Sequence, residues 1–163
     1  MFRPMRRARQ ELGKEECELI LERGTHGVLA LQGDEGYPYA VPVSYAYADG
    51  AVYFHGAKTG HKPDSIARCD KASFCIVDQD ELHREEYTTY YRSVIVFGRI
   101  RMLSDAAELR RAGELLGRRY GSGQTEEELQ AYLDKYSASF AAAKLEIEHM
   151  SGKAAIELIR EKK

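Results

Sequence analysis

One short segment of the chain concentrates the side chains that phosphate recognition needs. Gly56 and Gly60 bracket it, and glycine lets a backbone turn sharply and approach a ligand closely. Pro63 favours the first position of a helix, so we expect a helix over residues 63–68 whose N-terminus attracts an anion. The cationic and hydroxyl groups of the segment belong to Lys58, Thr59, His61 and Lys62. The pattern predicts a phosphate site, and the alternative is a solvated lysine-rich loop.

A strand expected over residues 37–47 provides a second candidate surface. Its odd positions carry large side chains and its even positions small ones, which is the period-2 alternation of a strand. Pro38 and Pro42 exclude a fully paired central strand and indicate an edge or a bulge. Pro42 and Ser44 leave a shallow surface on which a flat ring could lie. Alternatively, these small residues face a neighbouring subunit or helix.

A third candidate is the polar start of an apolar strand. Arg92 and Ser93 directly precede the run Val-Ile-Val-Phe at residues 94–97. Side chains at a strand end are placed to meet a ligand. The alternative is exposure to solvent, or an ion pair with the acidic loop expected over residues 78–86.

The five histidines differ in their surroundings. His55 and His61 flank the phosphate segment and are the better functional candidates, with His55 the candidate polar group beside a substrate. His26 and His149 lie within expected strands, and His83 lies in a charged loop. No HExxH spacing, CxxC pair or GxSxG elbow occurs. We therefore expect no metal site and no nucleophilic catalysis, and we expect Cys17, Cys69 and Cys75 to be free thiols.

The elements that must position these residues follow from periodicity. Apolar spacing predicts a helix over residues 14–23, and Asp49-Gly50 predicts a hairpin turn. Gly98 indicates a bulge in a long strand. Two capping patterns, Asp105 with Glu108 and Thr125 with Glu128, predict two consecutive helices. The expected strands cover residues 25–31, 37–47, 51–55, 72–77, 87–102 and 143–150, with a turn at Gly152 and a short strand over 155–159.

Length, charge and composition limit the kind of protein that this chain can be. The 163 residues fit one domain over 1–163, with a basic and flexible arm over residues 1–12. The net charge of −2 gives no indication of a nucleic-acid or membrane-surface partner. The sequence has no apolar stretch of membrane-spanning length and no signal-peptide pattern, so we expect a cytoplasmic protein.

The order of motifs resembles the pyridoxamine 5′-phosphate oxidase-like flavoproteins, and most closely their NimA-type nitroimidazole-resistance branch. The resemblance rests on residues 24–30, 36–43, 53–62, 91–98 and 147–153. It implies a mainly β fold with flanking helices, a six-stranded antiparallel split β-barrel of Greek-key type. It also implies a homodimer with FMN at the subunit interface. The implied FMN contacts are Val41, Pro42, Val43, Ser44, His55, Ala57, His61, Lys62, Arg92 and Ser93.

The resemblance implies an FMN-dependent oxidoreductase. It would take electrons from NAD(P)H or another reductant and pass them to a small planar acceptor, such as a 5-nitroimidazole. Many relatives carry Arg-Lys where this chain has His61-Lys62, and histidine is a weaker, pH-dependent phosphate partner. The C-terminus lacks the arginine-rich segment of true pyridoxamine phosphate oxidases. The alternatives are a non-catalytic FMN-binding or sensing module and a haem-binding split barrel, with His26, His55 or His149 as axial ligand.

Overall fold

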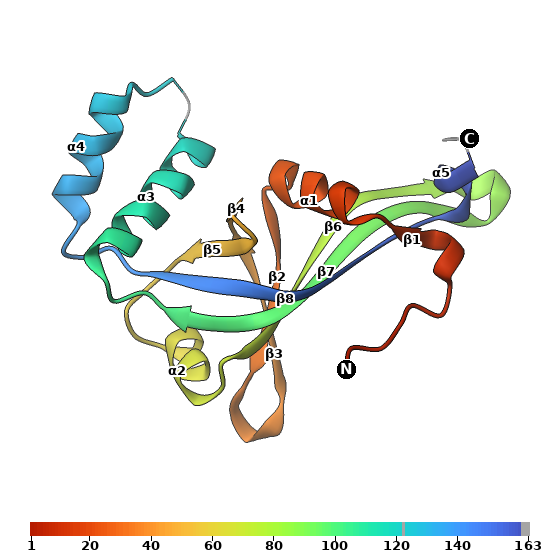
Figure 1. Cartoon of the computed structure of the whole chain (residues 1–163), viewed down its shortest axis with the longest axis horizontal. Helices are drawn as coiled ribbons and strands as arrows, with labels where there is room; N and C mark the ends of the chain where they lie inside the picture. Colours follow the sequence, from red (N-terminus) through yellow and green to blue (C-terminus); the bar gives the residue numbers. More distant parts are fainter. Residues whose placement is uncertain (122, 161–163) are drawn as a thin grey trace.

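The computed structural model describes residues 1–121 and 123–160 and places one curled sheet between flanking helices (Figure 1). The helices are α1 (Lys14–Arg23), α2 (His61–Arg68), α3 (Ala106–Tyr120), α4 (Glu126–Tyr136) and α5 (Ile156–Arg160). The strands are β1 (Glu11–Leu12), β2 (His26–Gln32), β3 (Pro38–Ser44), β4 (Ala46–Ala48), β5 (Ala51–His55), β6 (Lys71–His83), β7 (Thr88–Met102) and β8 (Ala142–Ala154). Three short 3-10 turns complete the described elements.

The antiparallel sheet curls into a split barrel. Its strand order is β3-β2-β6-β7-β8-β5-β4, with β1 added beside β8. The two edge strands, β3 and β4, are separated in the chain by Tyr45 alone. The sheet must therefore curve until its edges meet at that residue, although it stays open there. The mainly β fold with flanking helices is confirmed, whereas the described residues form eight strands rather than the expected six.

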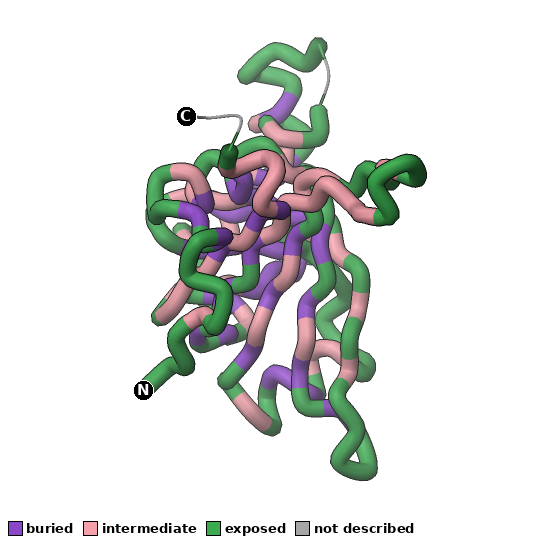
Figure 2. The backbone as a smooth tube through the Cα atoms, turned by 90° about the vertical axis from the view of Figure 1, so that its right-hand side faces the viewer, coloured by how far each residue is buried: buried purple, intermediate pink, exposed green. Residues whose placement is uncertain are grey.

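The interior of the barrel forms the main hydrophobic core. Figure 2 shows buried residues gathered at the centre of the molecule and exposed residues at the strand tips. Alternate residues of β2, β6 and β7 point inward, among them Leu29, Phe74 and Val96, each no more than 1% exposed. Helix α1 covers this core with Ile20 and Leu21. The alternation predicted for β3 is present, because its large residues pack on the core and its small ones are exposed.

Local signals in the sequence determine several turns and ends. Asp49 and Gly50 both have positive φ values, 50° and 71°, and join β4 to β5 as the predicted hairpin turn. Asp105 accepts a hydrogen bond from the Glu108 N–H at the start of α3, and Thr125 forms a full capping box in α4. The pairing of β7 with β8 shifts register between Phe97 and Gly98, which confirms the predicted bulge.

Three boundaries differ from the sequence prediction. Helix α2 begins at His61, so Pro63 occupies its third position. The expected polar loop over residues 78–86 is largely strand, because β6 pairs with β7 as far as His83. A two-stranded ribbon with both faces in solvent has no apolar alternation to reveal it. Strand β8 passes through Gly152 without turning, and residues 156–160 are helical rather than extended.

The N-terminal segment contacts the sheet. Glu11 and Leu12 pair with Lys153 and Gly152 of β8. Phe2 stacks on the ring of His149, with ring centroids 4.4 Å apart. In the described part of the chain, no helix is long and apolar enough to span a membrane.

Candidate functional site

The predicted phosphate segment joins the end of β5 to the start of α2. His55 ends β5 and pairs with Ala142 of β8, after which Gly56 and Ala57 lead into an exposed turn. Gly60 is the N-cap of α2 with a φ of +114°, a value that side-chain-bearing residues rarely adopt. The eight-residue helix α2 thus begins next to a glycine, which has no side chain to keep a ligand away from the backbone. Its first N–H groups are free to receive an anion.

Lys62 is the cation of this segment that lacks a partner. Its side chain is partly buried, and no hydrogen bond or ion pair with another described residue holds its ammonium group. Nζ lies against Gly56, where an added Cβ would be 3.3 Å away. Burial lowers the pKa of Lys62 below its ordinary value. A partly desolvated cation without an acidic neighbour is suited to bind an anionic ligand.

His61 has protein partners. Its ring stacks on Tyr39 with centroids 3.9 Å apart, and its Nε2 atom lies 3.5 Å from Oδ2 of Asp34. Asp34 also accepts a 2.7 Å hydrogen bond from Arg68. That hydrogen bond, together with the charge of His61, lowers the pKa of the Asp34 carboxyl. His61 and Lys62 are neighbours in the chain, but the His61 side chain has protein partners, whereas the Lys62 ammonium is available to a ligand.

The edge strand β3 presents the predicted small surface. Val41 and Val43 pack against the core, whereas Pro42 and Ser44 are exposed on the opposite face. Pro42 lies directly opposite Val28, and Ser44 lies opposite His26. The two valines can thus reach a ligand only through their backbone. Pro42 and Ser44 offer side chains as well.

The structure separates Arg92 from the phosphate segment. Arg92 donates to Oδ2 of Asp78 at 3.3 Å, and Asp78 is also held by two hydrogen bonds from Arg23 at 2.5 and 2.6 Å. Ser93 pairs with Val77 and Lys153. Successive strand residues point to opposite faces, so these two side chains do not share one surface. Within one chain, no described contact joins either of them to His55 or Lys62.

A cavity beside the phosphate segment was not predicted from the sequence. It has a volume of about 930 Å³ and lies between α3, α4 and the end of β5. Ser44, His55 and Gly56 line it, so it brings two of the predicted contact regions together. Its other walls come from helix residues such as Leu109, Leu116, Leu133, Tyr136 and Phe140. The capping patterns predicted the two helices, but only the tertiary packing shows the space beside them.

The cavity and the phosphate segment are physically connected. Lys58 donates from its Nζ to the carbonyl oxygen of Ala138, in the loop between α4 and β8. Ser139 and Phe140 of the same loop line the cavity. The hydroxyl of Tyr120, another lining residue, binds the carbonyl of Tyr45 at 2.7 Å and ties the end of α3 to the β3–β4 junction. The cavity walls are thus fixed to the strands that carry the predicted contacts.

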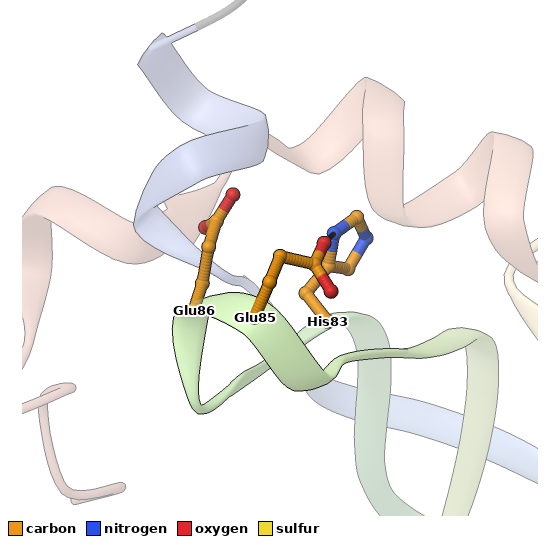
Figure 3. A group of neighbouring side chains, drawn as sticks. All are labelled: His83, Glu85 and Glu86. Carbon is orange, nitrogen blue, oxygen red and sulfur yellow. Dashed lines mark ion pairs between the residues drawn. The ribbon is translucent and has the colours of Figure 1, made fainter.

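None of the three remaining histidines is among the described residues that line this cavity, although His26 lies opposite the lining residue Ser44. His26 pairs with Thr25 through Nδ1 at 3.1 Å, and His149 stacks on Phe2. Figure 3 shows His83, Glu85 and Glu86 on the 3-10 turn between β6 and β7, with ligand atoms within 4.8 Å of one another. His83 stacks on Tyr90 and lies 3.5 Å from the Glu85 carboxylate. The turn is at the surface, and exposed acidic groups of this kind are common without a metal.

Comparison with known structures defines the class of fold. A protein from Bacteroides thetaiotaomicron named for 5-nitroimidazole antibiotic resistance superposes with a TM-score of 0.73 and 20% identity, covering 88% of this chain and 86% of that one. An FAD-binding protein from Mesorhizobium loti superposes with a TM-score of 0.65 and 25% identity, covering 90% of this chain and 97% of that one. An FAD- and haem-binding protein from Mycobacterium smegmatis superposes with a TM-score of 0.67 and 21% identity, covering 90% of this chain and 73% of that one. This chain has the split-barrel fold that these proteins share.

The sequence itself identifies the family. Residues 13–154 match the family model described as pyridoxamine 5′-phosphate oxidase. The chain belongs to this family. A comparison with curated proteins found no match.

Proposed function

We propose that this protein binds FMN and uses it as an oxidoreductase acting on a planar acceptor. The observation that carries the proposal is the partner-free Lys62 behind the N-terminus of α2. Names of structural neighbours include FAD-binding proteins and a nitroimidazole-resistance protein, which agrees with a flavin. FMN has a terminal phosphate whose size and charge fit one lysine and one helix N-terminus.

The residues present fit FMN at both of its ends. Lys62 and the backbone N–H groups that follow Gly60 would hold the phosphate. The exposed edge of Pro42 and Ser44 would lie along the ring. The flavin supplies hydride and electron transfer when bound, and the protein supplies binding and orientation. His55 would offer a hydrogen bond at the boundary between the ring and the cavity.

The proposed active form is a homodimer that buries the outer face of the sheet. One row across four strands, Pro42, Val28, Cys75 and Ile95, is set by direct pairing. Val28 is 41% exposed and Ile95 is 38% exposed. An exposed apolar face of this kind is typical of an interface, and a two-fold axis would place the same row on both partners. Because Pro42 ends the row, the second copy would border the flavin edge.

Sedimentation velocity tests the dimer. We expect the wild-type protein at twice 18.5 kDa and Ile95→Glu at 18.5 kDa, because a carboxylate would be buried unpaired at the interface. Leu19→Glu is the matched control, since Leu19 is 55% exposed on α1. An Ile95→Glu protein that stays dimeric would show that the partner binds elsewhere.

Absorption spectroscopy tests the cofactor and the chemistry. The purified protein should show flavin bands after FMN is added, bleach with NADH or NADPH, and recover when a 5-nitroimidazole is added. Bound flavin that no nicotinamide reduces would instead indicate a sensing module. A Soret band in place of flavin bands would indicate a haem protein and contradict the proposal.

A further inference from the structure

The helical hairpin of α3 and α4 has a rigid interior. Gly113 and Gly117 of α3 lie against Leu133 and Leu129 of α4, where an added Cβ would come within 2.7 and 2.4 Å of the leucine side chains. Arg110 of α3 joins the helices further through an ion pair with Asp134 and a hydrogen bond to Gln130, both on α4. The two helices are therefore held at one spacing. These helices are two of the elements that line the cavity.

Several of the polar groups that line the cavity are bound within the protein. Among the described lining residues, Arg110 alone carries a permanent charge, and it is paired with Asp134. The Tyr120 hydroxyl is bound to backbone groups of Tyr45. The Lys62 ammonium lies against Gly56 and is assigned to the flavin phosphate. Apart from it, an ionised ligand would find no unpaired permanent charge among the described lining residues, and it would lose its hydration without compensation. The lining selects a neutral molecule.

Aromatic side chains dominate one wall. Tyr132 and Tyr136 form a pair with ring centroids 4.6 Å apart, and Phe140 lies in the following loop. Such rings bind flat apolar molecules by stacking and by edge contacts. The volume of about 930 Å³ is near the upper end of the range that encloses drug-sized ligands, roughly 300–1,000 Å³. A single five-membered ring would leave most of this space to water.

We propose that this cavity binds a neutral, multi-ring aromatic molecule whose carbonyl or similar acceptor group bonds to His55. The only flavin-side residues that it touches are Ser44, His55 and Gly56 among those described, so a ligand here would lie next to the proposed flavin site. That such a ligand is the substrate rests on the proposed function, whereas its binding in the cavity does not. The natural acceptor would then be larger than a nitroimidazole.

The test uses the neutral naphthalene ketone PRODAN, whose emission rises and shifts to the blue in apolar surroundings. The 163-residue chain contains no tryptophan, so emission from that residue cannot interfere with the wild-type titration. We expect saturable binding of one PRODAN per chain. The double variant Tyr132→Ala/Tyr136→Ala should bind about tenfold more weakly through the loss of two aromatic contacts.

Matched variants locate the binding. Tyr87→Ala removes a tyrosine that is 97% exposed on the β6–β7 connection, at the end of the molecule opposite α3 and α4 (Figure 1), and should leave binding unchanged. Ala106→Trp places a large ring on an exposed lining position at the start of α3 and should also weaken binding. The assignment of PRODAN to this cavity would be overturned if Tyr87→Ala weakened binding as much as the double tyrosine variant does, or if Ala106→Trp did not weaken it.

Flavin binding is measured on the same samples. Calorimetry should show PRODAN binding with similar affinity in the presence of FMN. Competitive displacement by FMN, or the absence of saturable PRODAN binding in a protein that binds FMN, would overturn this inference alone. PRODAN binding by a protein that does not take up FMN would support the cavity assignment and contradict the proposed function.

Discussion

The ammonium group of Lys62 lies against the backbone of Gly56, where an added Cβ would be 3.3 Å from Nζ. Gly56 directly follows β5, and Lys62 is the second residue of α2. Their contact folds the connection into a cradle with a cation at its base. A side chain at residue 56 would make a tight contact with Nζ, and the flexible lysine would have to shift by a few tenths of an ångström. This relationship underlies the first two predictions.

Lys62→Ala should weaken FMN binding by about 10- to 100-fold, because a hydrogen bond to a charged group contributes roughly 1.5–3 kcal/mol. Fluorescence quenching of FMN during titration measures the change. Lys58→Ala is the matched control, since Lys58 is exposed and donates to the Ala138 carbonyl. Unchanged FMN affinity in Lys62→Ala would remove the phosphate assignment.

The affinity for FMN should fall at alkaline pH. Burial lowers the pKa of Lys62, and the phosphate binds its protonated form. Binding is therefore at full strength at neutral pH and weakens as the pH rises through the lowered pKa. In Lys62→Arg the side chain stays charged and the alkaline decline should disappear. The same decline in both proteins would assign it to another group.

Asp78 should contribute to the stability of the fold above acid pH. Burial alone would raise the pKa of its carboxyl, but hydrogen bonds and charges from Arg23 and Arg92 outweigh burial and lower the pKa. The stabilisation is present above the unfolded pKa of about 3.9 and is lost as pH falls through the lower folded value. Asp78→Asn should cost about 2 kcal/mol at pH 7.

Urea unfolding at several pH values measures this contribution. The difference in unfolding free energy between wild type and Asp78→Asn should shrink as the pH drops below about 4. A difference that is constant down to pH 2 would show that the carboxylate charge is not responsible.

The bulge at Gly98 should tolerate no side chain. A Cβ at this position would lie 1.9 Å from the carbonyl oxygen of Glu146 in the adjacent strand. Gly98→Ala should therefore destabilise the protein by about 3 kcal/mol or more, measured by thermal and urea unfolding. Gly13→Ala is the same chemical change in open space at the N-cap of α1 and should cost at most about 1 kcal/mol. Similar stabilities for the two variants would contradict the described register.

Local signals predicted the elements that depend on neighbours in sequence. Helix α1 has the predicted bounds of residues 14–23, and the cap of α4 at Thr125 forms as expected. The prolines of β3 correctly indicated an edge strand. The continuation of β8 through Gly152 was missed because it depends on a distant contact. An added Cβ there would lie 2.4 Å from Sγ of Cys17, so glycine serves packing rather than a turn.

The candidate site likewise has a part formed by neighbours in sequence and a part formed by distant residues. The phosphate segment could be predicted because its cations and glycines are contiguous in the chain, and its role in binding stays a prediction. The cavity was not, since it joins Ser44 and His55 to helices that lie far along the sequence. The alternative predicted for Arg92, an ion pair with the acidic segment over residues 78–86, is present at Asp78, and Arg92 also pairs with Glu16. A sequence pattern cannot choose between a ligand and a distant carboxylate.

The most direct test of the central claim compares FMN with riboflavin, which has the same ring but no phosphate. Flavin fluorescence titration of the wild-type protein should show FMN bound at least about tenfold more tightly than riboflavin, and Lys62→Ala should remove most of that preference. Equal affinity for the two flavins, or a preference that survives in Lys62→Ala, would contradict a phosphate cradle at the start of α2.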